Sequence, residues 1–137
     1  MDLADIPLFS MLRSRLGYLS ERQKLIAENV ANSNTGGYAP KDLKPFSFQA
    51  QVQAASMVTP AMTEPGHMLP ARVRSGVGAN FKSMKTRDSE TTLDGNSVVL
   101  EEQMMKMSDA RMNYDAAVGF YQKSLDLLRL ATRKPGG

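Results

Sequence analysis

The sequence predicts an all-α protein in which two long terminal helices pack as a coiled-coil-like pair, joined by an extended, irregular central connector. Apolar residues concentrate up to about Val30 and again from about Val98, and in both segments they recur at alternating spacings of three and four residues. The stretch between is rich in Pro, Gly, Ser, Thr and Gln. We therefore divide the 137-residue chain into an N-terminal helix with its turn (1–38), a connector (39–96) and a C-terminal helix (97–137), together one axial domain.

The N-terminal helix is predicted from its narrow apolar stripe. Pro7 suits the first turn, where its missing N–H costs nothing, and Gln23 fills the one polar position of the stripe. The run from Asn32 to Gly37 consists of turn and cap residues, so we expect the helix to end near Asn32. The residues expected to pack are Phe9, Leu12, Leu16, Leu19, Ile26 and Val30.

The connector is predicted to be irregular. It holds five of the seven prolines between Ala39 and Gly95 and shows no sustained period of a strand or a helix. Phe46–Ala50 has brief strand-like alternation, and Gln49–Met57 could equally form a short helix. An irregular stretch of this length counts against a closed compact domain.

The C-terminal helix is predicted from a second stripe, after a turn and N-cap at Asp94–Ser97. From Val98 to Arg133 it would span about 54 Å, too long to be satisfied by one short partner, so we expect contacts with other chains. Met105 and Met112 lie off the stripe and favour a second contact face. The stripe comprises Leu100, Met104, Met107, Arg111, Tyr114, Val118, Tyr121, Leu125 and Leu128, and its apolar members are expected to pack against the N-terminal stripe.

Composition excludes several classes of function. The net charge is +3, with basic residues scattered among acidic ones, which is not the concentrated basic face of a nucleic-acid binder. The absence of cysteine excludes disulfides and thiolate metal sites, and no apolar run approaches the roughly 20 residues of a membrane span. The acidic start Met1–Asp5 is no secretory signal, although export that reads an uncleaved N-terminus stays possible.

No catalytic, cofactor-binding or metal-binding residues are expected. The single histidine, His67, stands in a turn-like loop without a second histidine, a cysteine or a carboxylate cluster. Gly36-Gly37 lacks the lysine and hydroxyl residue of a phosphate-binding loop, so it reads as a helix-ending turn. We therefore expect a protein that is not an enzyme and needs no cofactor.

The segment from Asn29 to Tyr38 is the most specific feature of the sequence. By composition it is a helix C-cap and turn, but its pattern resembles the signature of flagellar axial proteins, approximately Asn-[Ile/Leu/Val]-Ala-Asn-x-x-Thr-x-Gly-Tyr. The matching positions are Asn29, Val30, Ala31, Asn32, Thr35, Gly37 and Tyr38. The chain thus resembles the flagellar basal-body rod protein family.

Within that family the chain looks most like a proximal-rod subunit. It has the length of the smallest class, without an inserted outer domain, and Lys41-Asp42-Leu43 resembles a group that follows the signature tyrosine there. Asp94-Gly95-Asn96-Ser97-Val98 resembles an element that precedes the C-terminal helix. The resemblance covers roughly residues 8–48 and 93–131; Gly36 departs from it, since rod proteins often carry proline there.

The resemblance implies a structural role. Members pair their terminal helices and stack helically into a hollow rod that crosses the periplasm, transmits torque and lets unfolded subunits pass. They are exported by the flagellar type III apparatus without a cleaved signal peptide. The implied partners are the chain itself, other proximal-rod proteins, the ring-to-rod adaptor, the motor (MS) ring and the export apparatus, with no nucleic acid and no direct membrane insertion.

Two alternatives remain open at this point. An inner-rod or needle subunit of a related type III secretion system has similar helices, but is not expected to carry the Asn29–Tyr38 signature. A soluble coiled-coil adaptor would use the same heptad helices and would form a stable dimer in solution.

Overall fold

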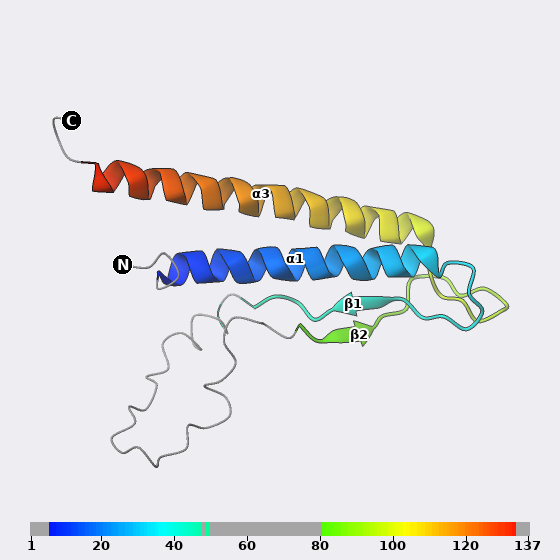
Figure 1. Cartoon of the computed structure of the whole chain (residues 1–137). Helices are drawn as coiled ribbons and strands as arrows, with labels where there is room; N and C mark the ends of the chain where they lie inside the picture. Colours follow the sequence, from blue (N-terminus) through cyan, green and yellow to red (C-terminus); the bar gives the residue numbers. More distant parts are fainter. Residues whose placement is uncertain (1–5, 48, 50–80, 134–137) are drawn as a thin grey trace, which may run out of the picture.

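Two antiparallel helices and a short two-stranded ribbon make up the fold (Figure 1). The computed structural model describes residues 6–47, 49 and 81–133. In chain order these contain α1 (Pro7–Ala31), β1 (Lys41–Leu43), β2 (Ser83–Lys85) and α3 (Leu100–Thr132). The predicted pair of long terminal helices is therefore confirmed, and none of the described helices has the length and apolar character needed to cross a membrane.

The ends of α1 lie where the sequence predicts them. Pro7 is the first helical residue, and the hydroxyl of Ser10 donates a 2.8 Å hydrogen bond to its carbonyl oxygen. Ala31 is the last helical residue, and the backbone N–H of the capping Asn32 reaches the carbonyl oxygens of Glu28 and Asn29, both at 3.1 Å. Proline at the start and an asparagine-rich turn at the end thus delimit a helix of 25 residues.

α1 lies between α3 and the ribbon and is buried on two faces (Figure 1). Toward α3, the rings of Phe9 and Tyr121 meet edge to face at 5.4 Å. Toward the ribbon side, Tyr18 contacts the rings of Phe46 and Phe81, each at a centroid distance of 5.4 Å. The second face was not predicted, although its buried residues recur every seven positions: Met11, Tyr18 and Leu25.

The ribbon corrects the expectation that the connector is irregular throughout. β1 and β2 pair antiparallel, with Lys41 opposite Lys85, Asp42 opposite Met84 and Leu43 opposite Ser83. Strands of three residues with lysines at their ends carry no alternating apolar pattern, so periodicity could not reveal them. The possible short helix over Gln49–Met57, most of the Phe46–Ala50 alternation and His67 lie outside the described residues.

The face that α3 turns to α1 also differs from the predicted stripe. Leu100 and Met104 are 49% and 64% exposed, whereas Gln103, Ala110 and Ala117 are buried. Each of these three buried residues directly precedes an expected one in the sequence, so the contact face is shifted by one residue at every second layer. In the remaining layers the expected residues do contribute, each half-buried: Met107, Tyr114, Tyr121 and Leu128. Small side chains let two helices approach closely, so the seam favours alanine where a search for apolar bulk favours leucine and methionine.

The predicted N-cap of α3 is wrong as well. The capping residue is Val99, which offers no side-chain hydrogen bond, and not a residue of the Asp94–Ser97 turn. Asp88 supplies the missing acceptor: its carboxylate accepts a 2.9 Å hydrogen bond from the N–H of Val99. An acceptor eleven residues upstream therefore occupies the helix N-terminus, where a negative charge is also favoured by the helix dipole.

Candidate functional site

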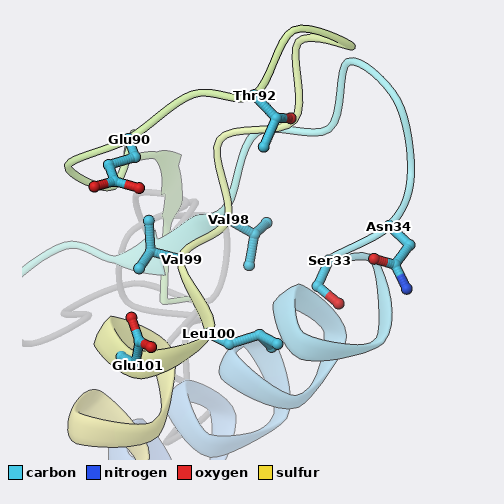
Figure 2. A pocket seen from close by; sticks show the side chains of 8 residues that line it. All are labelled: Ser33, Asn34, Glu90, Thr92, Val98, Val99, Leu100 and Glu101. Atoms are coloured by element: carbon cyan, nitrogen blue, oxygen red, sulfur yellow. The ribbon is translucent and has the colours of Figure 1, made fainter.

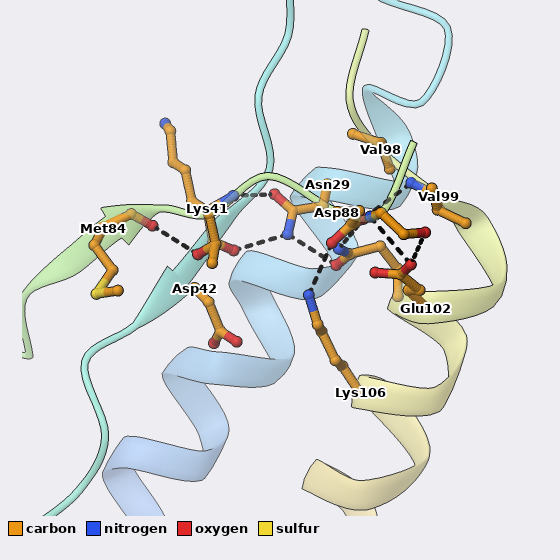
Figure 3. Close-up of polar contacts among 12 residues, drawn as sticks. Asn29, Lys41, Asp42, Met84, Asp88, Val98, Val99, Glu102 and Lys106 are labelled. Atoms are coloured by element: carbon orange, nitrogen blue, oxygen red, sulfur yellow. Dashed lines mark hydrogen bonds and ion pairs between the residues drawn. The ribbon is translucent and has the colours of Figure 1, made fainter. Parts of the chain in front are cut away.

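Asn29 is the centre of a polar cluster where the C-terminal end of α1 meets the N-terminal end of α3 (Figure 3). Its side-chain amide donates to the carbonyl oxygen of Lys41 at 2.8 Å and to Oε1 of Gln103 at 2.9 Å. Its Oδ1 accepts from the N–H of Lys41 at 2.9 Å and from the hydroxyl of Tyr38 at 3.2 Å. The four bonds use both donors and both acceptor positions of the amide, so this buried side chain links α1, β1 and α3 with nothing unsatisfied.

Gln103 also binds Asp88, so the hydrogen-bonded cluster extends from Asn29 to Asp88. Nε2 of Gln103 donates at 2.8 Å to Oδ2 of Asp88, the oxygen that also accepts from Val99. The other oxygen of Asp88 forms a 2.9 Å ion pair with Nζ of Lys106, and the Asp88 side chain is completely buried. A buried carboxylate is tolerated only with such partners, so the cluster places one negative charge at the start of α3 at a fixed position.

Burial alone would raise the pKa of Asp88, but the hydrogen bonds from Gln103, Lys106 and Val99 outweigh it and hold that pKa below its ordinary value. The pKa of Tyr38 is raised, first by burial and then by the nearby carboxylate of Glu28. Both groups therefore keep at neutral pH the protonation state that their hydrogen bonds require: an ionised acceptor at Asp88 and a neutral hydroxyl donor at Tyr38.

Asn96 makes a second connection, between the turn that follows α1 and the turn that precedes α3. Its amide donates to the carbonyl oxygens of Asn32 at 2.9 Å and Thr35 at 2.6 Å, across more than sixty residues of sequence. Its Oδ1 accepts from the N–H of Val98 at 2.9 Å, which bends the chain toward α3. The turn after α1 and the turn before α3 are therefore one unit, held by a buried asparagine from the second turn.

The signature turn itself is braced by its own side chains. Nδ2 of Asn32 donates to the carbonyl oxygen of Glu28 at 2.8 Å, and Oδ1 of Asn32 accepts from the hydroxyl of Thr35 at 3.2 Å. Ser97 donates its N–H to the carbonyl oxygen of Tyr38 at 3.0 Å. The amide of Asn32 thus gives the carbonyl oxygen of Glu28 a second donor beside the Asn32 N–H, which holds the last turn of α1 in place.

Two glycines allow the two turns to approach. Gly37 and Gly95 have φ angles of 71° and 83°, in the left-handed region that side chains rarely adopt. A Cβ added to Gly95 would lie 3.4 Å from Cα of Gly37, and the N–H of Gly37 donates to the carbonyl oxygen of Asp94 at 2.9 Å. The glycine of the signature therefore meets the glycine of Asp94-Gly95-Asn96 backbone to backbone.

Arg22 and Asp42 tie the ribbon to the middle of α1. The guanidinium donates two hydrogen bonds to the carboxylate, at 2.9 and 3.0 Å, and both groups are partly buried. The pKa of Arg22 is raised, chiefly by the hydrogen bond to Asp42. With Leu43 buried beside it, the group Lys41-Asp42-Leu43 is strand β1, and each of its three residues contacts α1 or sits in the core.

The remaining residues singled out in the sequence have varied positions. Val30 is half-buried and Ala31 exposed, at the end of α1. Phe9, Leu19 and Ile26 are buried, as expected for packing, whereas Leu100 and Met104 are exposed. The other expected packing residues are half-buried: Leu12, Leu16, Met107, Tyr114, Val118, Tyr121, Leu125 and Leu128.

Several residues of the cluster escaped the sequence analysis, namely Gln103, Asp88 and Lys106. Nothing in their spacing marks them, because Asp88 precedes its partners by 15 and 18 residues in irregular chain. Gln103 stands between expected apolar positions, where a polar residue reads as solvated surface. One feature of the sequence could have indicated Gln103: it lies seven residues before Ala110 and fourteen before Ala117, on the same face of the helix.

A shallow depression opens at the same end of the molecule (Figure 2). Its volume is about 240 Å³, and Val98, Val99 and Ser33 line it with the carboxylates of Glu90 and Glu101 at its edge. Within the described residues no three potential metal ligands gather at one point. The chemistry available here is that of a contact surface with backbone, hydroxyl and carboxylate groups.

Comparisons with known proteins identify relatives over nearly the whole chain. The flagellar basal body rod protein FlgB of Agrobacterium fabrum is 32% identical over 136 residues, covering 94% of this chain and 94% of that protein. The proteins of the same name from Escherichia coli K12 and Shigella flexneri are each 28% identical over 108 residues, covering 75% of this chain and 76% of theirs. No protein-family profile matches the chain.

Proposed function

The chain belongs to the FlgB family of flagellar basal body rod proteins, and from this membership we propose how its pair of terminal helices functions in the rod. It is a structural subunit of the proximal rod of the flagellar basal body and assembles with other rod and basal-body components. The needle-subunit and adaptor alternatives are disfavoured, because the relative that matches over 94% of the chain carries the rod name, as do the two that match over 75%. The conclusion depends chiefly on that full-length similarity.

We propose that the α1–α3 pair is the repeating unit of a hollow, helical drive shaft. Stacking many such pairs requires each copy to present the same rigid surface. The cluster around Asn29 supports this role, because it ties both helices and the ribbon at one end of the unit. A rigid joint at that point would let torque pass from one helix to the other instead of bending the connection between them.

Residues Asn32–Tyr38 would fix the direction in which the connector leaves α1. The exposed Leu100 and Met104, expected in the sequence as packing residues, would contact neighbouring subunits instead of α1. Apolar side chains left exposed on a rigid helix are typical of surfaces that become buried on assembly. Rod packing would in this way complete the burial that a single chain leaves unfinished.

The wider setting follows from the family. We propose that the subunit lies in the periplasm-spanning rod, between the motor (MS) ring with its ring-to-rod adaptor and the other proximal-rod proteins. It would reach that place through the flagellar type III export apparatus without a cleaved signal. It would have no catalytic activity and no cofactor, its role being to transmit load and to enclose a channel.

Mass spectrometry of intact, detergent-extracted basal bodies tests the proposal. We expect several copies of this chain per particle, and their absence from intact particles would overturn the rod role. A matched pair of variants sharpens the result. Leu19→Asp places a charge at a buried position and should abolish incorporation and motility, whereas Ser20→Asp alters the adjacent exposed residue and should leave both intact. Equal motility of the two variants would contradict the packing.

A further inference from the structure

The face of α3 that points away from α1 carries a second apolar stripe. Met105, Met112, Phe120, Leu127 and Leu130 are each between 58% and 68% exposed. With the exposed Asp109, Ala116 and Lys123 they recur at spacings of three and four residues along the whole helix. A continuous stripe of this kind is a helix-packing surface, and within the described chain nothing covers it.

The order of residues along this stripe is symmetric about Ala116. Four residues away on either side stand Met112 and Phe120, and seven away stand Asp109 and Lys123. Eleven away stand Met105 and Leu127. From Met105 to Leu127 every position thus has a complement at the same distance on the other side, apolar with apolar and acid with base, whereas Leu130 beyond this range would face Glu102. Two identical helices laid antiparallel with their Ala116 residues together would match at each of the seven layers from Met105 to Leu127.

The charges decide the orientation of such a pair. Antiparallel packing places Asp109 of one copy beside Lys123 of the other, twice, whereas parallel packing in register places Asp109 beside Asp109. Neither side chain forms an ion pair within the described part of the chain. Arg22 lies within electrostatic range of Asp109, but the guanidinium is already bonded to Asp42 at 2.9 Å.

The residues near the symmetry point are small. Ala116 is exposed, and Gly119 has nothing within 4 Å of the position of a Cβ, so intrachain packing does not require a glycine there. Glycine inside a helix costs about 1 kcal/mol relative to alanine. Its presence beside Ala116 is explained if another backbone approaches at that point.

We infer that the outer face of α3 binds a second copy of this chain, antiparallel, about a two-fold axis at Ala116. Such an interface is closed, because each copy uses the same surface and points the opposite way. A rod in which every copy points the same way has no place for it. The dimer is therefore a state of the free subunit that keeps the apolar stripe covered and competes with assembly; this last step alone rests on the proposed function.

Exchange of the charges tests the pairing in the full-length chain by sedimentation equilibrium. Asp109→Lys and Lys123→Asp should each weaken the dimer by about tenfold or more, because each creates two repulsive pairs. The double variant exchanges the charges and should recover most of the affinity. Asp115→Lys, on the same helix but off the stripe, is the control and should leave the dimer unchanged. A monomeric parent chain, or a double variant no tighter than the single ones, would overturn the inference.

Cysteine cross-linking tests the orientation independently, because the chain has no cysteine of its own. A mixture of Met105→Cys and Leu127→Cys chains should form the mixed disulfide, and neither variant alone should cross-link with itself. Self-cross-linking of Met105→Cys would indicate parallel helices and refute the antiparallel dimer. Circular dichroism of each variant confirms that helix content is retained, so a lost dimer reports on the interface.

The outcome is separable from the rod proposal. A confirmed dimer with no copies of the chain in basal bodies would favour the coiled-coil adaptor and leave the pairing intact. Copies in basal bodies with no dimer in solution would leave the rod role and remove only this inference.

Discussion

The side-chain amide of Asn29 donates a 2.9 Å hydrogen bond to Oε1 of Gln103, 74 residues further along the chain. Both side chains are almost completely buried, and each makes further hydrogen bonds, to Lys41 and to Asp88. A buried polar pair inside a helix seam can form in one alignment only, because any slip leaves both groups unsatisfied. The pair therefore defines the axial position of α3 along α1.

Asn29→Ala should destabilise the chain by about 2–4 kcal/mol. The change removes four hydrogen bonds and leaves the buried Oε1 of Gln103 and the partly buried N–H of Lys41 without their partner. Urea unfolding followed by circular dichroism measures the difference. Asn34→Ala is the matched control, an exposed asparagine of the same turn, and should change stability by less than about 0.5 kcal/mol. Similar losses in both variants would contradict the central role of Asn29.

The three glycines of the two turns should differ in their tolerance of alanine. Gly95→Ala should cost most, because it combines a φ of 83° with a Cβ placed 3.4 Å from Cα of Gly37. Gly37→Ala has the unfavourable φ alone and should cost about 1–2 kcal/mol. Gly36→Ala has no unfavourable φ, and its Cβ would lie at an ordinary contact distance of 3.5 Å from the carbonyl oxygen of Asp94, so it should be nearly neutral or slightly stabilising. Thermal unfolding of the three variants gives the order, and a Gly36 variant as unstable as the Gly95 variant would refute this geometry.

Stability should depend on pH through Asp88. Its pKa is held below the ordinary value of about 3.9, so the unfolded chain binds this proton more tightly than the folded chain. The stabilisation is complete above about pH 5 and is lost as the pH falls through 4 and below. Asp88→Asn should therefore be less stable at pH 7, and its deficit should shrink toward pH 3. Thermal unfolding across this range measures the deficit. Asp115→Asn, at an exposed site of α3, is the control and should lose little stability at pH 7.

Ala117→Leu should destabilise the helix pair by about 1–3 kcal/mol. Ala117 is 3% exposed within the apolar cluster that contains Leu19, so three added carbons force the helices apart. Ala131→Leu is the control at an exposed position of the same helix. Urea unfolding compares the two. A stabilised Ala117 variant would mean that the seam is loose and that Leu100 and Met104 could share it.

The sequence was sufficient for the elements whose signals are local. Pro7 and the asparagine-rich turn mark the ends of α1, because both of these signals lie within one turn of the helix ends. The repeats of three and four residues identify both helices correctly. The position of the turn at Asp94–Ser97 was also readable, although not its relation to the helix that follows.

Features that depend on distant partners were not predictable. Ala110 and Ala117 bury little apolar area by themselves, and only the close approach of α1 makes their face the buried one. The pairing of Lys41 with Lys85 places two like charges opposite each other, which strand propensity disfavours. It forms because Asn29 fixes the backbone of Lys41 and because Asp42 binds Arg22.

Tyr18 holds Phe46 and Phe81 at equal ring distances, and these two residues stand where the described chain leaves the ribbon and where it returns. The base of the intervening segment is thus closed by tilted and edge-to-face aromatic contacts and by the paired strands, independently of what lies between. The entropy of closing such a loop grows only with the logarithm of its length, by about 0.6 kcal/mol for each doubling. Segments of quite different size, even a whole inserted domain, could therefore be accommodated between Phe46 and Phe81 while the helix pair keeps its geometry.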